Sequence, residues 1–157
     1  MPDARGRLRV YGDTSAIGGC FDAEFAAGSL ALFDRIRAGE CVLVLSDVTV
    51  AELRDAPEAV RAVVSGLRPD SVETVLFTPE AERLAKAYVA AAVLPPKMWA
   101  DAQHIAVATL AGVDVLVSWN FKHVVNLRRI HGYNEVNAEL GYPSVEIRTP
   151  REVVNEE

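Results

Sequence analysis

Short runs of consecutive apolar residues alternate along this chain with longer stretches of helical periodicity. The apolar runs predict β-strands at residues 7–12, 41–45, 72–77 and 114–118, with a further short strand at 145–148. The run CVLVL at 41–45 lacks polar alternation, which is typical of a strand covered on both faces in a parallel sheet. The pattern therefore favours buried, parallel strands.

The intervals between these runs carry helix signals. Apolar positions at helical spacing, caps and stops predict helices within 22–39, 48–55, 57–67, 79–94, 100–113 and 121–140. The prediction ends the fourth of these at Pro95-Pro96 and treats Asp13-Thr14-Ser15 as a loop or cap after the first strand. Because strand and helix alternate throughout, we expect an α/β fold with a mostly parallel sheet.

Composition sets the size and the environment that we expect. The chain has 157 residues and is half apolar, which suits one domain across residues 1–157. Cys20 and Cys41 are too few for a disulfide scaffold, and the start MPDARGRLR lacks the apolar core of a signal peptide. The longest apolar run, at 87–94, is shorter than the ~20 residues that span a bilayer. We expect a cytoplasmic protein without a membrane segment.

Net charge narrows the classes of partner. A net charge of −6 argues against a surface coated with positive charge for general nucleic-acid binding. It leaves room for a local basic rim beside an acidic pocket, as a nucleic-acid enzyme that works through bound metal can have.

Polar side chains collect where the expected strands end. Asp13 follows the first strand, Glu52 lies on the helix after the second, Asp101 opens the helix after the two prolines, and Asn120 follows the fourth strand. Since ligands bind at the carboxyl ends of parallel strands, these four side chains are candidates for one site. Two charges 4 Å apart at a dielectric of 20 repel by about 4 kcal/mol, so converging carboxylates favour a bound cation.

The donor types point to a hard cation. Carboxylate and amide oxygens, with no thiolate or paired histidine nearby, suit Mg²⁺ or Mn²⁺ better than zinc. Such a site supports in-line hydrolysis of a phosphodiester. Each residue also has an ordinary alternative: Asp13 and Asp101 could be helix caps, and Glu52 could be a solvated surface acid.

Three stretches of the sequence carry a resemblance to a known family. RVYGDTSAIGG, VTVAELRDAP and DAQHIAVATLAGVDVLVSWNFKHVVN resemble, in order and spacing, the PIN domain of the VapC-like toxins of type II toxin-antitoxin systems. The resemblance extends from about residue 8 to about residue 130. It implies a three-layer α/β/α fold with four to five strands and a Mg²⁺- or Mn²⁺-dependent ribonuclease. It further implies an RNA substrate, a cognate antitoxin and a homodimer.

The resemblance also implies roles for individual residues. By motif position, Asp13, Glu52 and Asp101 are the metal-binding acids, and Asn120 completes the catalytic set. The family often has an acid where this chain has Asn120, or three residues later, where it has His123. Neither residue is acidic, so the resemblance predicts a weaker metal site with one tightly held ion.

Several neighbours of this set are candidates for supporting roles. Thr14 and Ser15 could bond the Asp13 carboxylate or a phosphate, or simply cap a helix. His104 shares a helix face with Asp101 and could bond a ligand carboxylate, or pack. With Lys97, the side chains of Lys122 and His123 could form a positive rim for phosphate, or be ordinary surface residues. Trp99 and Trp119 are expected to pack.

Two other classes of protein compete with the nuclease. One is a PIN-like module that has lost catalysis and binds RNA or a protein partner. The other is a phosphotransfer receiver domain, which needs an acceptor aspartate at the end of a middle strand. The second and third strands end without one, so the receiver is disfavoured.

Overall fold

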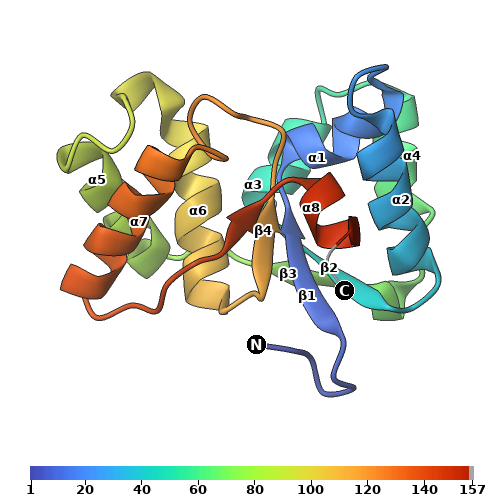
Figure 1. Ribbon diagram of the computed structural model, residues 1–157, viewed down its shortest axis with the longest axis horizontal. Helices are drawn as coiled ribbons and strands as arrows, with labels where there is room; N and C mark the ends of the chain where they lie inside the picture. Colours follow the sequence, from blue (N-terminus) through green and yellow to red (C-terminus); the bar gives the residue numbers. More distant parts are fainter. Residues whose placement is uncertain (156–157) are drawn as a thin grey trace.

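Five parallel strands form one sheet at the centre of the molecule (Figure 1). The computed structural model describes residues 1–155. The strands are β1 (Leu8–Gly12), β2 (Cys41–Ser46), β3 (Val72–Val75), β4 (Val115–Val117) and β5 (Ile147–Arg148). Their order in the sheet is β3-β2-β1-β4-β5, and every neighbouring pair is parallel. The expected parallel sheet is confirmed, with β1 at its centre.

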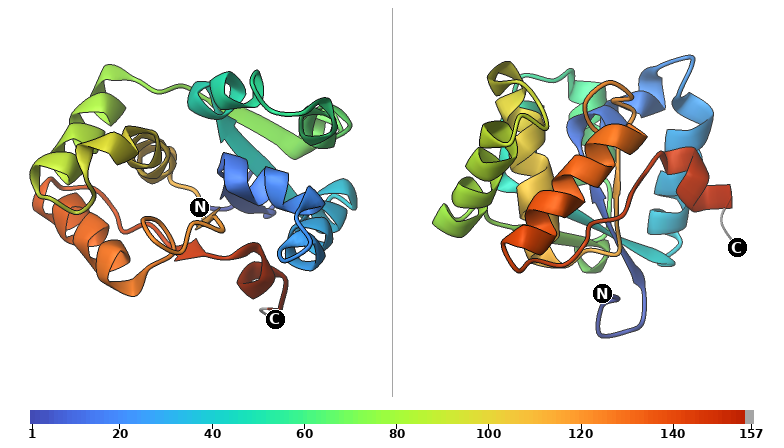
Figure 2. Two further views of the ribbon diagram at one scale, coloured as in Figure 1. Left: turned by 90° about the horizontal axis from the view of Figure 1, so that it is seen from above. Right: turned by 60° about the vertical axis from the view of Figure 1, so that its left-hand side comes forward.

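Helices cover both faces of this sheet (Figure 2). One face carries α5 (Pro79–Ala90), α6 (Trp99–Ala111) and α7 (Leu127–Glu139). The other carries α1 (Thr14–Gly18), α2 (Ala26–Arg37), α4 (Glu58–Ser65) and α8 (Pro150–Asn155). Helix α3 (Asp47–Leu53) follows β2 and contacts both α1 and α6. Three short 3-10 turns complete the described elements: η1 (Gly19–Phe21), η2 (Pro69–Ser71) and η3 (Pro96–Met98).

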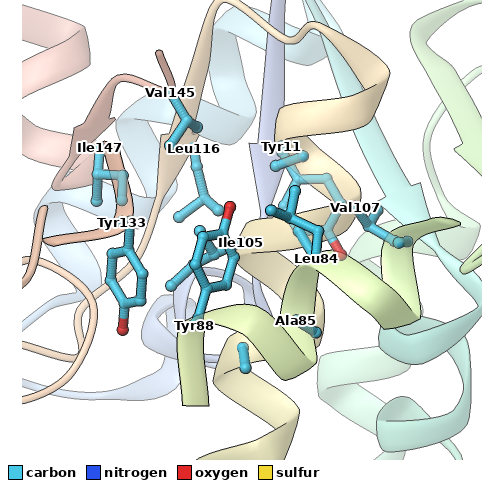
Figure 3. Packing of buried hydrophobic residues seen from close by; sticks show 14 of the residues in the cluster. Tyr11, Leu84, Ala85, Tyr88, Ile105, Val107, Leu116, Tyr133, Val145 and Ile147 are labelled. Atoms are coloured by element: carbon cyan, nitrogen blue, oxygen red, sulfur yellow. The ribbon is translucent and has the colours of Figure 1, made fainter. Parts of the chain in front are cut away.

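Alternating side chains of the central strands fill two separate cores. Tyr11, Val44 and Leu116 point to the α5–α7 side, where they pack with Tyr88, Ile105 and other buried residues (Figure 3). Their strand neighbours Val10, Leu43 and Val117 point to the α1–α2 side. Because both faces of each strand are buried, the strands need continuous apolar sequences, as CVLVL indicated. The three-layer α/β/α fold is thereby confirmed.

Caps set the starts of the helices that follow the strands. Ser46 accepts a hydrogen bond from the Thr49 amide in a capping box at the start of α3, and Thr78 caps α5 in the same way. Helix α6 ends at Gly112, whose φ of 63° lies in the left-handed region that glycine adopts without strain. These caps agree with the boundaries that the sequence predicted.

Two helix boundaries differ from the sequence prediction, and two helices were not predicted. Helix α5 ends at Ala90, well before Pro95, because Ala92 takes a left-handed φ of 59° that turns the chain. Helix α7 begins only at Leu127, capped by Asn126, so residues 121–126 form a turn. The loop or cap expected at Asp13-Thr14-Ser15 is the cap and start of α1, and neither α1 nor α8 was predicted as a helix.

No single helix within residues 1–155 has the length and apolar character needed to cross a membrane. The bent pair formed by residues 14–21 and 26–37 meets that test only jointly, by length and composition.

Candidate active site

The predicted acids lie at the carboxyl edge of the sheet, the upper edge in Figure 1. Asp13 follows β1 directly and is the N-cap of α1. Glu52 lies on α3 after β2, and Asp101 lies in the first turn of α6. Asn120 comes three residues after the end of β4. The parallel topology therefore delivers all four side chains to the same edge by independent segments.

Asp13 is held by its own helix. Its Oδ1 accepts hydrogen bonds from the Ser15 hydroxyl at 2.7 Å and from the Ala16 amide at 3.0 Å. The Ser15 hydroxyl also accepts the Trp119 amide at 2.9 Å, so it joins α1 to the segment after β4. Asp13 is buried, with only 5% of its surface exposed. Asp13 thus combines the predicted capping role with a place in the acidic set.

Glu52 is the acid with the most hydrogen-bond support. Its Oε1 accepts from Thr14 Oγ1 at 2.7 Å and from His104 Nε2 at 2.5 Å. Burial works to raise the pKa of Glu52, but the bonds from His104 and Thr14 outweigh it and place the pKa below its ordinary value. Glu52 is therefore a fixed carboxylate and not a free surface acid. Thr14 acts on Glu52, whereas the sequence linked it to Asp13.

A buried polar chain stands behind Glu52. Tyr11 Oη lies 2.7 Å from His104 Nδ1 and 2.7 Å from Ser46 Oγ. Tyr11 and Ser46 are fully buried and His104 is 4% exposed. Burial raises the pKa of Tyr11 well above its ordinary value, so the phenol keeps its proton. Since the Glu52 carboxylate only accepts, His104 donates to it through Nε2, and its Nδ1 pairs with the Tyr11 hydroxyl on the other side of the ring.

Asp101 is the acid with the least support. Burial, together with the negative charge of Asp13 and then of Glu52, raises the pKa of Asp101 to about 6. The charge of His104 and the hydrogen bond from Asn120 oppose that rise only in part. Repulsion from the other two carboxylates therefore contributes to the raised pKa of Asp101.

Asn120 binds Asp101 through its amide nitrogen. Its Nδ2 donates to Asp101 Oδ2 at 3.2 Å. Its Oδ1 accepts the amides of Lys122 at 3.2 Å and His123 at 3.0 Å, which fixes the orientation of the side chain. The carbonyl oxygen that the sequence offered as a metal ligand is thus engaged by the turn. Asn120 lies in the site, but as a donor to Asp101.

The three carboxylates have the donor chemistry for a hard cation. Each uses one oxygen for the hydrogen bonds described above, and among residues 1–155 the other oxygen of each accepts none. Their mutual repulsion is the charge that a divalent cation would neutralise. In the part of the chain described, however, no three His, Cys, Asp or Glu side chains are drawn together as a ligand set. The predicted metal ligands Asp13, Glu52 and Asp101 remain a prediction.

Trp119 is a packing residue, as expected. Its indole donates to Ser29 Oγ at 2.8 Å, and the ring stacks on Phe25 with 4.5 Å between ring centroids. A Cβ at Gly19 would lie 2.6 Å from its Nε1, and one at Gly28 would lie 2.8 Å from its Cη2, so both glycines make room for the ring. Trp99 is half-buried and packs edge-on against Phe77. Trp119 is therefore not an open stacking surface.

The two basic candidates beside Asn120 differ in exposure. Lys122 is exposed, whereas His123 is buried and its Nδ1 has no hydrogen-bond partner among residues 1–155. Burial, and then the positive charges of Arg129, Lys122 and Lys97, lower the pKa of His123. The sequence placed His123 in a positive rim. In the structure His123 is buried below the surface, whereas Lys122 and Lys97 are exposed.

A groove of about 780 Å³ lies elsewhere, between the end of α5 and α7. It is lined by residues that include Val93, Leu127, Arg129 and Glu135, and none of the four predicted site residues lines it.

Comparison with solved structures identifies the fold. VapC20 of Mycobacterium tuberculosis, a toxin that cleaves the sarcin-ricin loop, matches with a TM-score of 0.55 and 14% identity over 87% of this chain and 98% of that chain. A chain of VapBC2 from Rickettsia felis, solved bound to a DNA fragment from its promoter, matches with a TM-score of 0.58 and 11% identity over 90% and 98%. The fold is that of a VapC-like PIN domain. No family model and no curated protein match the sequence itself.

The VapC-like fold confirms the resemblance that the sequence motifs indicated, at the level of architecture. What sequence reasoning missed in this PIN-like edge is the Tyr11–His104 pair. A signal was available, because Tyr11 is the one hydroxyl-bearing residue in the run RLRVYG and lies two positions before Asp13. Ser46, the cap of α3, also takes part, because its hydroxyl binds that of Tyr11.

Proposed function

We propose that this protein is a Mg²⁺- or Mn²⁺-dependent endoribonuclease that hydrolyses RNA phosphodiester bonds, and that it is the toxin of a type II toxin-antitoxin pair in the cytoplasm. The observation that carries the proposal is the set of three carboxylates at the carboxyl edge of a VapC-like sheet, each with one oxygen left free of hydrogen bonds within residues 1–155. The likeness to VapC20, a toxin that cleaves the sarcin-ricin loop, supports the same reaction class.

Asp13, Glu52 and Asp101 would hold the cation through their free oxygens. When bound, such a cation lowers the pKa of a water and neutralises charge on the phosphoryl oxygens. His104 and Thr14 hold the Glu52 carboxylate in one orientation by bonding its other oxygen. Ser15 and the Ala16 amide do the same for Asp13. These residues position the acids without competing for the oxygens that would face the phosphate.

Cleavage of RNA by the purified protein tests this proposal. Wild type, Asp13→Asn and Asp101→Asn are incubated with RNA and Mn²⁺, and EDTA serves as the blank. Asp34→Asn is a matched control, because Asp34 is an exposed acid on α2 that pairs with Arg37. We expect cleavage by wild type and Asp34→Asn, and at least about a 100-fold loss in the two site variants. Equal cleavage by all four proteins would assign the activity to a contaminant or to another site.

A catalytically weakened binding module is the second candidate. The observation that favours it is the engagement of Asn120 Oδ1 by the turn, which leaves the fourth family position without a free oxygen. RNA binding by wild type with no cleavage in Mg²⁺ or Mn²⁺ would select this candidate.

Antitoxin binding and dimer formation are part of the same proposal. The likeness to a chain of VapBC2 supports a protein partner. Co-expression with the product of an adjacent small gene, followed by mass measurement of the purified species, tests both. A protein that stays monomeric and does not co-purify with that product would contradict both antitoxin binding and dimer formation.

A further inference from the structure

We propose that the turn of residues 120–123 binds one unpaired nucleotide of a single-stranded RNA beside the acidic edge. Phe121 would stack on the base, and Lys122 with Lys97 would face the phosphate. This inference rests on the proposed function for its substrate class and adds the side of the site on which the strand lies.

The 120–123 turn is fixed before any ligand binds. Asn120 accepts four backbone amides, those of residues 122 and 123 at Oδ1 and those of Val124 and Val125 at its carbonyl. Tyr133 Oη donates to the His123 carbonyl at 2.6 Å and so ties the turn to α7. A preformed turn loses little conformational entropy on binding, which favours its use as a binding element.

Phe121 presents a supported aromatic ring to solvent. Half of its surface (50%) is exposed. Its ring centroid lies 6.1 Å from Phe25 and 6.3 Å from Trp119, which themselves stack on each other. Trp119, which is buried, and Phe25, which is half-buried, support the ring, and half of its surface stays exposed. An open ring on a fixed turn is the arrangement that stacks unpaired bases without sequence preference.

Positive charge is available beside the turn, although the whole chain carries −6. Lys122 is exposed directly after Phe121. Lys97 is exposed on η3, which leads directly into α6 and Asp101, the residue that Asn120 bonds. An aromatic ring interleaved with cations matches the base and phosphate of one nucleotide.

The hydrogen bond from Asn120 Nδ2 to Asp101 Oδ2 puts the turn next to the acids. The lysines lie on one side of this contact and the carboxylates on the other. An RNA strand would therefore lie with one phosphate at the lysines and the neighbouring phosphate at the acids. Duplex RNA keeps its bases stacked within the helix, so the turn selects single strands.

The stacking half is tested by binding without cleavage. A fluorescent single-stranded RNA 12-mer is titrated in EDTA with wild type, Phe121→Ala and Phe121→Trp, and the same strand annealed to its complement is the duplex probe. Leu140→Ala is the matched control, because Leu140 is equally exposed (51%) at the far end of α7. We expect about tenfold weaker binding for Phe121→Ala, wild-type or tighter binding for Phe121→Trp, and no change for Leu140→Ala. The fluorescence added by Phe121→Trp should be quenched by the single strand and not by the duplex.

The phosphate half is tested by salt dependence. Lys122→Ala and Lys97→Ala are compared with Lys86→Ala, an exposed lysine on α5 that pairs with Glu82. Lys122→Ala and Lys97→Ala should each lower the slope of log affinity against log salt by about 0.7, and Lys86→Ala should leave it unchanged. Competition by inorganic phosphate against the 12-mer separates a site for any phosphate from one that needs the base as well.

Two outcomes would overturn the inference. One is unchanged RNA affinity in Phe121→Ala together with no fluorescence quenching in Phe121→Trp. The other is a salt slope that neither Lys122→Ala nor Lys97→Ala changes. If wild type cuts RNA in Mn²⁺ while these results hold, this inference fails and the proposed function stands. If the binding results are as expected but no variant or metal gives cleavage, the turn is an RNA site and the nuclease proposal fails.

Discussion

The two halves of the acidic edge contain the same chemical group in opposite circumstances. Glu52 lies under hydrogen bonds from His104 and Thr14, and its pKa is lowered. Asp101 receives one amide from Asn120 and faces two other carboxylates, so its pKa is raised to about 6. Hydrogen bonds from the protein therefore stabilise the ionised form of Glu52 more than that of Asp101. We call Glu52 with its donors the compensated half of the edge, and Asp101 with Asn120 the uncompensated half. The uncompensated half is where a cation would have its largest effect.

The compensated half should be the more costly to disrupt. His104→Ala leaves the Glu52 carboxylate and the Tyr11 hydroxyl without their shared partner in a buried setting. We expect a loss of about 2–4 kcal/mol in the free energy of unfolding, measured by urea denaturation. Asn134→Ala on α7, outside this chain of groups, is a comparison for loss of a polar side chain. A loss below about 1 kcal/mol for His104→Ala would mean that the Glu52 contact contributes little to folding.

Removing only the hydroxyl behind His104 should have a smaller effect. Tyr11→Phe keeps the ring in the core and deletes the hydroxyl that bonds His104 Nδ1 and Ser46 Oγ. We expect a loss of about 1–2 kcal/mol in the free energy of unfolding, measured by urea denaturation. The ¹⁵N shift of His104 Nδ1 should change more than that of Nε2, because only Nδ1 loses its partner. An unchanged Nδ1 shift would contradict the contact between Tyr11 and His104.

The uncompensated half should gain stability when its charge is removed. Because the folded-state pKa of Asp101 lies above its unfolded value near 3.8, the folded protein holds the proton more tightly, and ionisation destabilises it as pH rises from about 4 to 6. Asp101→Asn should therefore unfold at a higher free energy than wild type above pH 6, by about 1 kcal/mol after allowing for solvent screening. The difference should vanish near pH 4. If the stability of Asp101→Asn runs parallel to that of wild type from pH 4 to 8, the raised pKa of Asp101 is contradicted.

Adding charge to this half should have the smallest effect on folding and the opposite sign. Asn120→Asp keeps one oxygen for the amides of residues 122 and 123 and turns the other toward Asp101. We expect a loss of about 0.5–1 kcal/mol in EDTA, from repulsion between neighbouring carboxylates. In Mn²⁺ the variant should recover this loss and bind the ion more tightly than wild type. No change in Mn²⁺ affinity would place residue 120 outside the cation's reach.

The comparison of the two halves also shows what the sequence could reveal. The acids Asp13, Glu52 and Asp101 were predictable, because strand ends in a parallel sheet share one edge and the motifs fix the register. The lowered pKa of Glu52 was not, because it depends on His104, whose ring is held by Tyr11, 93 residues away in the chain. The place of Tyr11 two positions before Asp13 marks it as a candidate, but only the packed structure shows that His104 is its partner.

Local conformation set a similar limit at the turn after β4. Residues 121–140 carry an apolar periodicity that fits a helix, yet the first six form a turn. The reason is that the Asn120 side chain satisfies the amides of residues 122 and 123, and Asn126 then starts α7 as its cap. Periodicity could not separate these residues from the helix, because capping competes with it at the level of single hydrogen bonds.

Binding of Mn²⁺ to the metal-free protein tests the central claim most directly. Calorimetric titration compares wild type with Asp13→Asn and with the control Asp34→Asn, each checked for folding by its melting curve. We expect one bound ion in wild type and Asp34→Asn, and at least about tenfold weaker binding in Asp13→Asn. Absence of measurable Mn²⁺ binding by wild type, or equal binding by Asp13→Asn, would contradict a cation site at the carboxyl edge.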